Sequence, residues 1–180
     1  MTQEIKIPND RIGAIIGKSG ETRKYLEKIL NVTLEIDSQT GLIEVINKED
    51  ALAEIRSMEV IKAIGRGFSP ERAKKLLEDD DMILTLIDLA DIADTPQKLA
   101  RIRGRIIGRD GKAREQIENM TGTVVSVYGK TVGIIGMPDQ SNDAHTAVTM
   151  LVNGSDHNSV FNFLERKKKE AKMDMLNYYY

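Results

Sequence analysis

Hydrophobic positions along the first half of the chain follow two different periods, and the changes between them predict its helices and strands. Alternation of apolar and polar residues is typical of a half-buried strand, and apolar residues every three or four positions are typical of a helix with one buried face. The pattern predicts strands at 4–8, 32–36 and 42–46, helices at 11–16 and 20–30, and a helix at 49–64 with Leu52, Ile55, Val60, Ile61 and Ile64 roughly on one buried side.

The second half of the chain repeats the order strand, helix, helix, strand, strand, helix. Thr95 followed by Pro96 is a typical helix start, because threonine caps a helix and proline fits its first turn. A short helix at 71–77 joins the halves. The expected elements are strands at 82–89, 123–127 and 131–135, and helices at 96–107, 111–120, 139–151 and 159–176.

An internal repeat explains why the two halves share this order. The run Ile-Ile-Gly-Lys-Ser-Gly at 15–20 returns as Ile-Ile-Gly-Arg-Asp-Gly at 106–111, an offset of 106 − 15 = 91 residues. At the same offset Glu27 matches Glu118. Seen once, such a pattern is weak evidence, but here it recurs between the same two helices of each half. We therefore interpret the chain as two copies of one domain.

The repeated glycines predict a loop that binds a phosphate backbone. Each loop closes one helix and opens the next, whose first turn has unpaired N–H groups and a partial positive charge. A side chain at a glycine position would hold the phosphates away or strain the turn. The alternative is that Gly17, Gly20, Gly108 and Gly111 are only tight-turn residues.

With this loop inside this order of elements, the chain resembles two KH domains in tandem, of the type with a C-terminal third helix. A KH loop clamps about four nucleotides of single-stranded RNA. The expected fold class is α+β, with two type I KH domains and a C-terminal helix. We expect a first domain with its linker helix at 1–79, a second domain at 80–154, and a C-terminal helix and tail at 155–180.

Three further segments, 63–73, 99–111 and 158–169, resemble those of the archaeal ribosomal RNA-processing KH proteins. That family is similar to the eukaryotic small-subunit assembly factors known as the partner of Nob and the Krr type. The resemblance implies binding near the 3′ end of small-subunit ribosomal RNA, and contacts with a Nob-type endonuclease or a translation-initiation factor. Eukaryotic members usually lack one Gly-x-x-Gly loop, whereas both are present here, so a protein-only role does not carry over to the first domain.

Basic residues are concentrated around the second loop. The segment 98–114 has seven basic residues and one acidic residue, a charge of 7 − 1 = +6, whereas 7–23 carries 3 − 2 = +1. Arg101, Arg105 and Arg109 are four apart, near one helical face. We predict that the second domain supplies most of the RNA affinity and the first adds reach or specificity; a solvated helix face is the alternative.

The two residues between the glycines divide into two roles. Lys18 and Arg109 come first and can reach a phosphate, and Ser19 and Asp110 come second, where both are good helix N-caps. Asp110 either caps its helix and points away from the RNA or accepts a hydrogen bond from a base or ribose. The residues predicted to bind RNA are Gly17, Lys18, Ser19, Gly20, Arg23, Arg101, Arg103, Arg105, Gly108, Arg109, Asp110, Gly111, Lys112 and Arg114.

Composition narrows the possible functions. The formal net charge is −2, so any electrostatic case rests on local clusters, and aromatic residues at 4% argue against broad base stacking. The absence of cysteine removes disulfides, thiolate metal sites and thiol nucleophiles. We interpret His145 and His157 as structural residues. We expect no catalytic residues, no metal and no cofactor.

No apolar run approaches the roughly 20 residues of a membrane helix, and no signal-peptide pattern begins the chain, so we expect a monomeric cytoplasmic protein. The alternative to an RNA-binding processing factor is a protein-docking adaptor for an endonuclease or initiation factor, with RNA binding secondary. The basic run at 165–172 fits binding of RNA or protein about as well as it fits a solvated helix face. A nuclease would need a convergent set of carboxylates and histidines that the sequence lacks.

Overall fold

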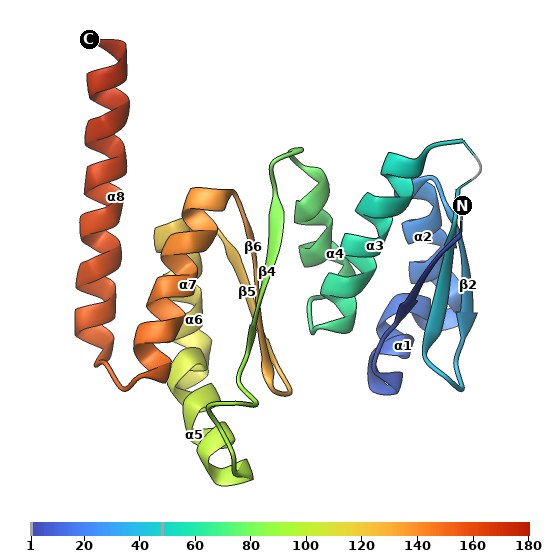
Figure 1. Cartoon of the computed structure of the whole chain (residues 1–180), viewed down its shortest axis with the longest axis horizontal. Helices are drawn as coiled ribbons and strands as arrows, with labels where there is room; N and C mark the ends of the chain where they lie inside the picture. Colours follow the sequence, from blue (N-terminus) through green and yellow to red (C-terminus); the bar gives the residue numbers. More distant parts are fainter. Residues whose placement is uncertain (1, 48) are drawn as a thin grey trace. The chain divides into compact units, whose positions relative to one another are not determined.

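The computed structural model describes residues 2–47 and 49–180, and the chain divides into two compact units, Met1–Leu84 and Thr85–Tyr180. Both units have three-stranded sheets with helices packed against them, as Figure 1 shows for each unit separately. The predicted α+β class is therefore confirmed.

The first unit begins with strand, helix, helix, strand, strand and helix, in the predicted order. A short helix and a 3-10 turn follow its third helix. The elements are β1 (Thr2–Lys6), α1 (Asn9–Ile16), the 3-10 turn η1 (Lys18–Gly20), α2 (Glu21–Leu30), β2 (Thr33–Asp37), β3 (Leu42–Ile46), α3 (Ala51–Gly65), α4 (Pro70–Ala73) and the 3-10 turn η2 (Lys74–Leu77).

The sheet of the first unit has the order β1-β3-β2, and both neighbouring pairs are antiparallel. Leu34 lies opposite Val45, and both are fully buried together with Ile43. Helices α1, α2 and α3 contribute the other half of the core, including Ile15 and Leu26. Each such side chain stabilises the fold by roughly 1.5–3 kcal/mol on burial.

The start of α3 differs from the prediction. Leu52 and Ile55, expected on the buried side, are 56% and 54% exposed. Glu54 is buried instead, and its carboxylate accepts a hydrogen bond of 3.0 Å from the backbone N–H of Asn47. A satisfied carboxylate can be buried where an apolar residue was expected, so the buried face of α3 becomes apolar only from Val60 onwards.

The second unit repeats the plan and adds a long helix. Its elements are β4 (Ile83–Asp88), α5 (Pro96–Ile107), the 3-10 turn η3 (Arg109–Gly111), α6 (Lys112–Thr121), β5 (Val124–Tyr128), β6 (Thr131–Gly136), α7 (Pro138–Val152) and α8 (His157–Tyr179). Strand β4 begins at the last two residues of the first unit.

The second sheet has the order β4-β6-β5, which matches the first sheet strand for strand. Ile106 and Ile117 from the two helices beside the loop are fully buried in the same core as Val125 and Ile134. Helix α8 packs against α6 and α7, on the side away from the sheet in Figure 1. In the described residues, no helix is long and apolar enough to cross a membrane.

Candidate nucleic-acid interface

The two Gly-x-x-Gly loops follow the same backbone path. Gly17 and Gly108 have φ of 71° and 73°, with ψ of 178° and 177°. Ser19 and Asp110 both have φ of 54°, in the left-handed region that non-glycine residues rarely adopt. The closing glycines have φ of 75° and 74°. The loops therefore present nearly identical backbone surfaces in the two units.

The first glycine of each loop is required by the close approach of the following helix. A Cβ on Gly17 would lie 2.1 Å from Oγ1 of Thr22 and 2.9 Å from its backbone nitrogen. A Cβ on Gly108 would lie 2.5 Å from the Cβ of Ala113 and 2.8 Å from its backbone nitrogen. Of the two reasons predicted for these glycines, strain in the turn is the one that applies to Gly17 and Gly108.

The second glycine of each loop faces open space. A Cβ on Gly20 would meet nothing within 4 Å, and one on Gly111 would meet only the guanidinium of Arg114 at 3.9 Å. These residues are the N-caps of α2 and α6, so the prediction that Ser19 and Asp110 are the caps is wrong. No side chain makes a capping hydrogen bond at either helix. The backbone N–H groups of Glu21 and Lys112 donate to the carbonyls of Lys18 and Arg109 within the 3-10 turns. The positive end of each helix dipole is thus left without a side-chain cap, and an anion can approach it.

Exposed cations surround both loops, with more around the second. Lys18 is exposed in the first loop, and Arg101, Arg109 and Lys112 are exposed around the second, where Arg114 is half-buried. The expectation that Arg109 continues one helical face with Arg101 and Arg105 is wrong, because α5 ends at Ile107 and the left-handed Gly108 turns the chain. Arg109 projects from the loop itself.

Arg105 has a structural role that the sequence did not reveal. Its Nε donates a hydrogen bond of 3.1 Å to the carbonyl of Leu151, and its Nη2 donates to the carbonyl of Ser155. Those carbonyls lie at and just beyond the end of α7, so the guanidinium caps that helix. Nε and Nη2 of Arg105 therefore have partners in the protein backbone, and a contact of this residue with RNA stays a prediction.

The first unit contains the same arrangement. Arg11 in α1 donates from Nε to the carbonyl of Ile64, at 2.9 Å, and from Nη2 to the carbonyl of Phe68, at 2.8 Å. In both units an arginine on the helix before the loop thus binds two carbonyls four residues apart at the end of the closing helix. The two arginines differ by one helical turn in their distance from the loop, which hides the parallel in the sequence.

Two further predicted residues are partly engaged within the protein. Arg23 pairs with Glu27 at 3.3 Å, in the half-exposed first turns of α2. Arg103 is half-buried, and its Nε is buried without a hydrogen-bond partner among the described residues. Because this atom is shielded from solvent, its missing partner does not itself point to an outside acceptor, and a contact of Arg103 with RNA stays a prediction.

The repeated glutamates link each second helix to its edge strand. Oε1 of Glu27 accepts a hydrogen bond of 2.9 Å from the backbone N–H of Leu34, and Oε1 of Glu118 accepts one of 2.8 Å from Val125. Both amides therefore point away from the sheet, toward the helix. Their match at the repeat offset was the signal for this role in the sequence.

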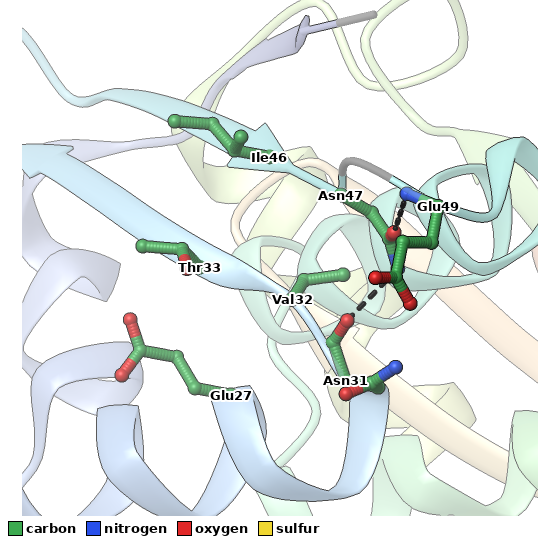
Figure 2. A pocket seen from close by; sticks show the side chains of 7 residues that line it. All are labelled: Glu27, Asn31, Val32, Thr33, Ile46, Asn47 and Glu49. Carbon is green, nitrogen blue, oxygen red and sulfur yellow. Dashed lines mark hydrogen bonds between the residues drawn. The ribbon is translucent and has the colours of Figure 1, made fainter.

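A concavity at the far end of α2 has the wrong charge for phosphate. Figure 2 shows Glu27 and Glu49 facing it from opposite sides, with Asn31 and Thr33 between them. Asn47 holds its wall by donating to the carbonyl of Asn31 at 2.8 Å. Two carboxylates would repel a phosphodiester, and the loop lies at the opposite end of α2, so we do not assign RNA to this concavity.

Two carboxylates near these elements have a lowered pKa. Hydrogen bonds from Thr40 and Gln39 hold the pKa of Asp37, at the end of β2, below its ordinary value. Hydrogen bonds from Ser159 lower the pKa of Asp156, with smaller effects from His157 and Arg105. Asp156 is the N-cap of α8 and accepts a 2.9 Å bond from the Ser159 backbone N–H.

The order of elements, the β1-β3-β2 sheet and a Gly-x-x-Gly loop between the first two helices define a type I KH domain, and this chain has two. The family models agree: residues 83–169 match the eukaryotic type KH domain (KH-domain type I), and residues 2–62 match the KH domain. The chain belongs to the family of KH-domain proteins that includes PNO1 and Dim2p.

Three relatives carry this assignment. The KH domain-containing protein MJ0443 of Methanocaldococcus jannaschii is 43% identical over 93% of this chain and 74% of its own length. The pre-rRNA-processing protein PNO1 of Chaetomium thermophilum is 33% identical over 91% of this chain and 64% of its own. The crystal structure of the a/eIF2alpha-aDim2p-rRNA complex from Pyrococcus horikoshii contains a chain 48% identical to this one, with a TM-score of 0.88, covering 94% of this chain and 95% of that one. The predicted resemblance is confirmed.

Proposed function

We propose that this protein binds single-stranded RNA through its two Gly-x-x-Gly loops and acts in the processing and assembly of the small ribosomal subunit, near the 3′ end of its RNA. The observation that carries the proposal is the pair of matching loops, each with an open glycine at a helix N-terminus that has no side-chain cap. The positive end of the helix dipole, with no side chain in front of it, suits a sugar-phosphate backbone.

The relatives support the choice of RNA and partner. PNO1 is named as a pre-rRNA-processing protein, and the Pyrococcus complex joins aDim2p to ribosomal RNA and to the initiation factor a/eIF2alpha. We infer that this chain binds small-subunit ribosomal RNA and a translation-initiation factor, and that it also meets a Nob-type endonuclease. It acts by binding and not by catalysis, in the cytoplasm.

The second loop is proposed to carry most of the affinity. With Arg105 assigned to the fold, Arg101, Arg109 and Lys112 remain exposed around this loop, whereas Lys18 alone is exposed within the first. Each phosphate contact by a cation makes the binding constant depend on salt, with a slope of about 0.7 per contact for a single strand. The count of exposed cations therefore predicts a steeper salt dependence for the second loop.

Charge reversal in each loop tests the proposal. Arg109→Asp is expected to weaken binding of a single-stranded ribosomal RNA oligonucleotide more than Lys18→Asp does, and both more than Lys28→Asp. Lys28 is a matched control because it is exposed in the last turn of α2, at the opposite end from the loop. Fluorescence anisotropy over a salt series measures the change. If all three variants bind the RNA equally well, the assignment of RNA binding to these loops is wrong.

Protein docking is the second candidate, and the distal part of α8 favours it. Met173 and Leu176 are 63% and 53% exposed, although both are apolar. If docking is the main function, the loop variants keep their binding to an initiation factor and RNA affinity is weak at every salt concentration. Surface plasmon resonance with the immobilised factor distinguishes the two candidates.

A further inference from the structure

We propose that α8 holds the second Gly-x-x-Gly loop in its binding conformation, with His157 and Arg105 as positioning residues. The proposal rests on the RNA-binding function of this loop and assigns a role to the helix that only the second domain carries. It concerns how strongly the loop binds and not which atoms touch RNA.

The last turn of α5 leaves a backbone carbonyl that needs a partner from outside the helix. The left-handed Gly108, with φ of 73°, stops the helix, so the carbonyls of its last turn lack the N–H groups of a continuing helix. Gly104 receives the N–H of Gly108 at 2.9 Å. The next carbonyl, that of Arg105, lies 2.8 Å from Nε2 of His157. A carbonyl can only accept, so His157 is the donor.

The side chain of Arg105 adds a second link between α5 and the segment that leads into α8. While its carbonyl accepts from His157, its guanidinium donates to Leu151 at the end of α7 and to Ser155 in the turn before α8. The residue three positions before Gly108 is thus fixed through its backbone and its side chain together. A shift of α8 would be transmitted directly to the turn that begins the loop.

Helix α8 is anchored firmly enough to act as a support. Val160 and Leu164 are buried in the core of the second domain, at 0% and 1% exposure. The ring of His157 lies 6.1 Å from that of Phe161, which packs against the same core. Because α8 packs against α6, whose N-terminus forms the other side of the loop, the helix braces both flanks of the Gly-x-x-Gly turn.

The first domain cannot form this brace. Arg11 makes the same pair of hydrogen bonds as Arg105, but the sequence after α3 contains no histidine before His145. The first loop therefore serves as an internal reference within the same molecule. A loss of stability of the second domain as a whole would also reach its strands β5 and β6, whereas loss of the brace would reach only the turn at 108–113.

The test uses two substitutions of His157 in the full chain. His157→Phe keeps the ring beside Phe161 and removes the donor, and His157→Gln keeps an N–H donor without the ring. We expect His157→Phe to weaken binding of a single-stranded ribosomal RNA oligonucleotide about three- to tenfold, the usual effect of losing one partly buried hydrogen bond. His157→Gln should recover most of that loss.

A salt series separates positioning from phosphate contact. His157→Phe should leave the slope of log Kd against log salt unchanged, whereas Arg109→Asp should lower the slope because it removes a phosphate contact. His145→Phe is the matched control, since His145 is exposed on α7. In the free protein, amide exchange at 108–113 should be faster in His157→Phe, with exchange at 17–22 unchanged.

The outcomes are distinct. Unchanged RNA affinity and unchanged exchange at 108–113 in His157→Phe would overturn the brace, even if Arg109→Asp weakens binding as the proposed function requires. Loss of affinity in both His157 variants, without recovery by glutamine, would also overturn it. If Arg109→Asp binds like the unsubstituted protein, the proposed RNA-binding function fails, and the brace fails with it.

Discussion

Single glycines divide the work of each loop. A side chain at Gly108 would collide with Ala113 in the first turn of α6, whereas a side chain at Gly111 would face open space. If RNA binds as proposed, a substitution at Gly108 therefore reports on folding and one at Gly111 on binding. Substitution of both glycines together would mix the two effects.

Alanine at each glycine separates these effects. Gly108→Ala is expected to lower the free energy of unfolding by roughly 2–5 kcal/mol, from a left-handed alanine and a clash with backbone. Gly111→Ala should cost only about 1–2 kcal/mol, the left-handed strain alone, and should still weaken RNA binding because its methyl group stands where the phosphate is proposed to lie. Urea unfolding and anisotropy measure the two quantities. A Gly111→Ala protein with full RNA affinity would contradict the assignment.

At the scale of helices, Arg105 joins α5 to α7. Arg105→Met removes the cap from two carbonyls and is expected to lower the free energy of unfolding by about 1–3 kcal/mol. Its salt slope for RNA binding should stay as in the parent, because Arg105 makes no phosphate contact in this assignment. Arg101→Met is the control: Arg101 is exposed on the same helix, so the slope should fall and stability should change little.

The N-cap of α8 predicts a pH dependence. Hydrogen bonds from Ser159 lower the pKa of Asp156, so its carboxylate contributes stability above the unfolded pKa of about 3.9, and that contribution is lost as pH falls through the lower folded pKa. Asp156→Asn keeps a capping oxygen that does not titrate. Thermal unfolding between about pH 5 and pH 2 should therefore show a smaller loss of Tm in Asp156→Asn than in the parent. An identical loss would exclude this contribution.

The sequence contained the elements and the loops because both depend on local signals. The hydrophobic periods gave the strands and helices to within a few residues, and the repeat of Gly17 and Gly20 as Gly108 and Gly111 located the candidate interface. Both signals come from residues that are close together in the sequence. Apolar residues repeat with the period of their helix or strand, and glycine is favoured where a turn needs a positive φ.

What the sequence did not reveal came from contacts between distant residues. The helix-capping role of Arg105 was missed because its partners lie 46 and 50 residues away. Leu52 was predicted to be buried because it is apolar, but Glu54 takes the buried side of the helix instead. The burial of Glu54 depends on its hydrogen bond with the backbone N–H of Asn47, a contact that the sequence does not show. Charge and period alone cannot distinguish a phosphate ligand from a helix cap.

At the scale of the molecule, two loops on one chain predict avidity. Each KH loop clamps about four nucleotides, so an RNA of about five nucleotides can engage one loop, and a longer RNA that reaches from one loop to the other can engage both. We expect the longer RNA to bind at least tenfold more tightly, and Lys18→Asp or Arg109→Asp to remove most of that gain. Titration of both lengths against all three proteins measures it. A gain that survives either substitution would show that the loops do not act together.

The matched dihedral angles of the two turns have a practical consequence. Since 15–20 and 106–111 trace one geometry, the Lys-Ser and Arg-Asp pairs between their glycines should be exchangeable without repacking either domain. Exchanging the two pairs would therefore change the charge of each loop while the backbone of both domains stays the same.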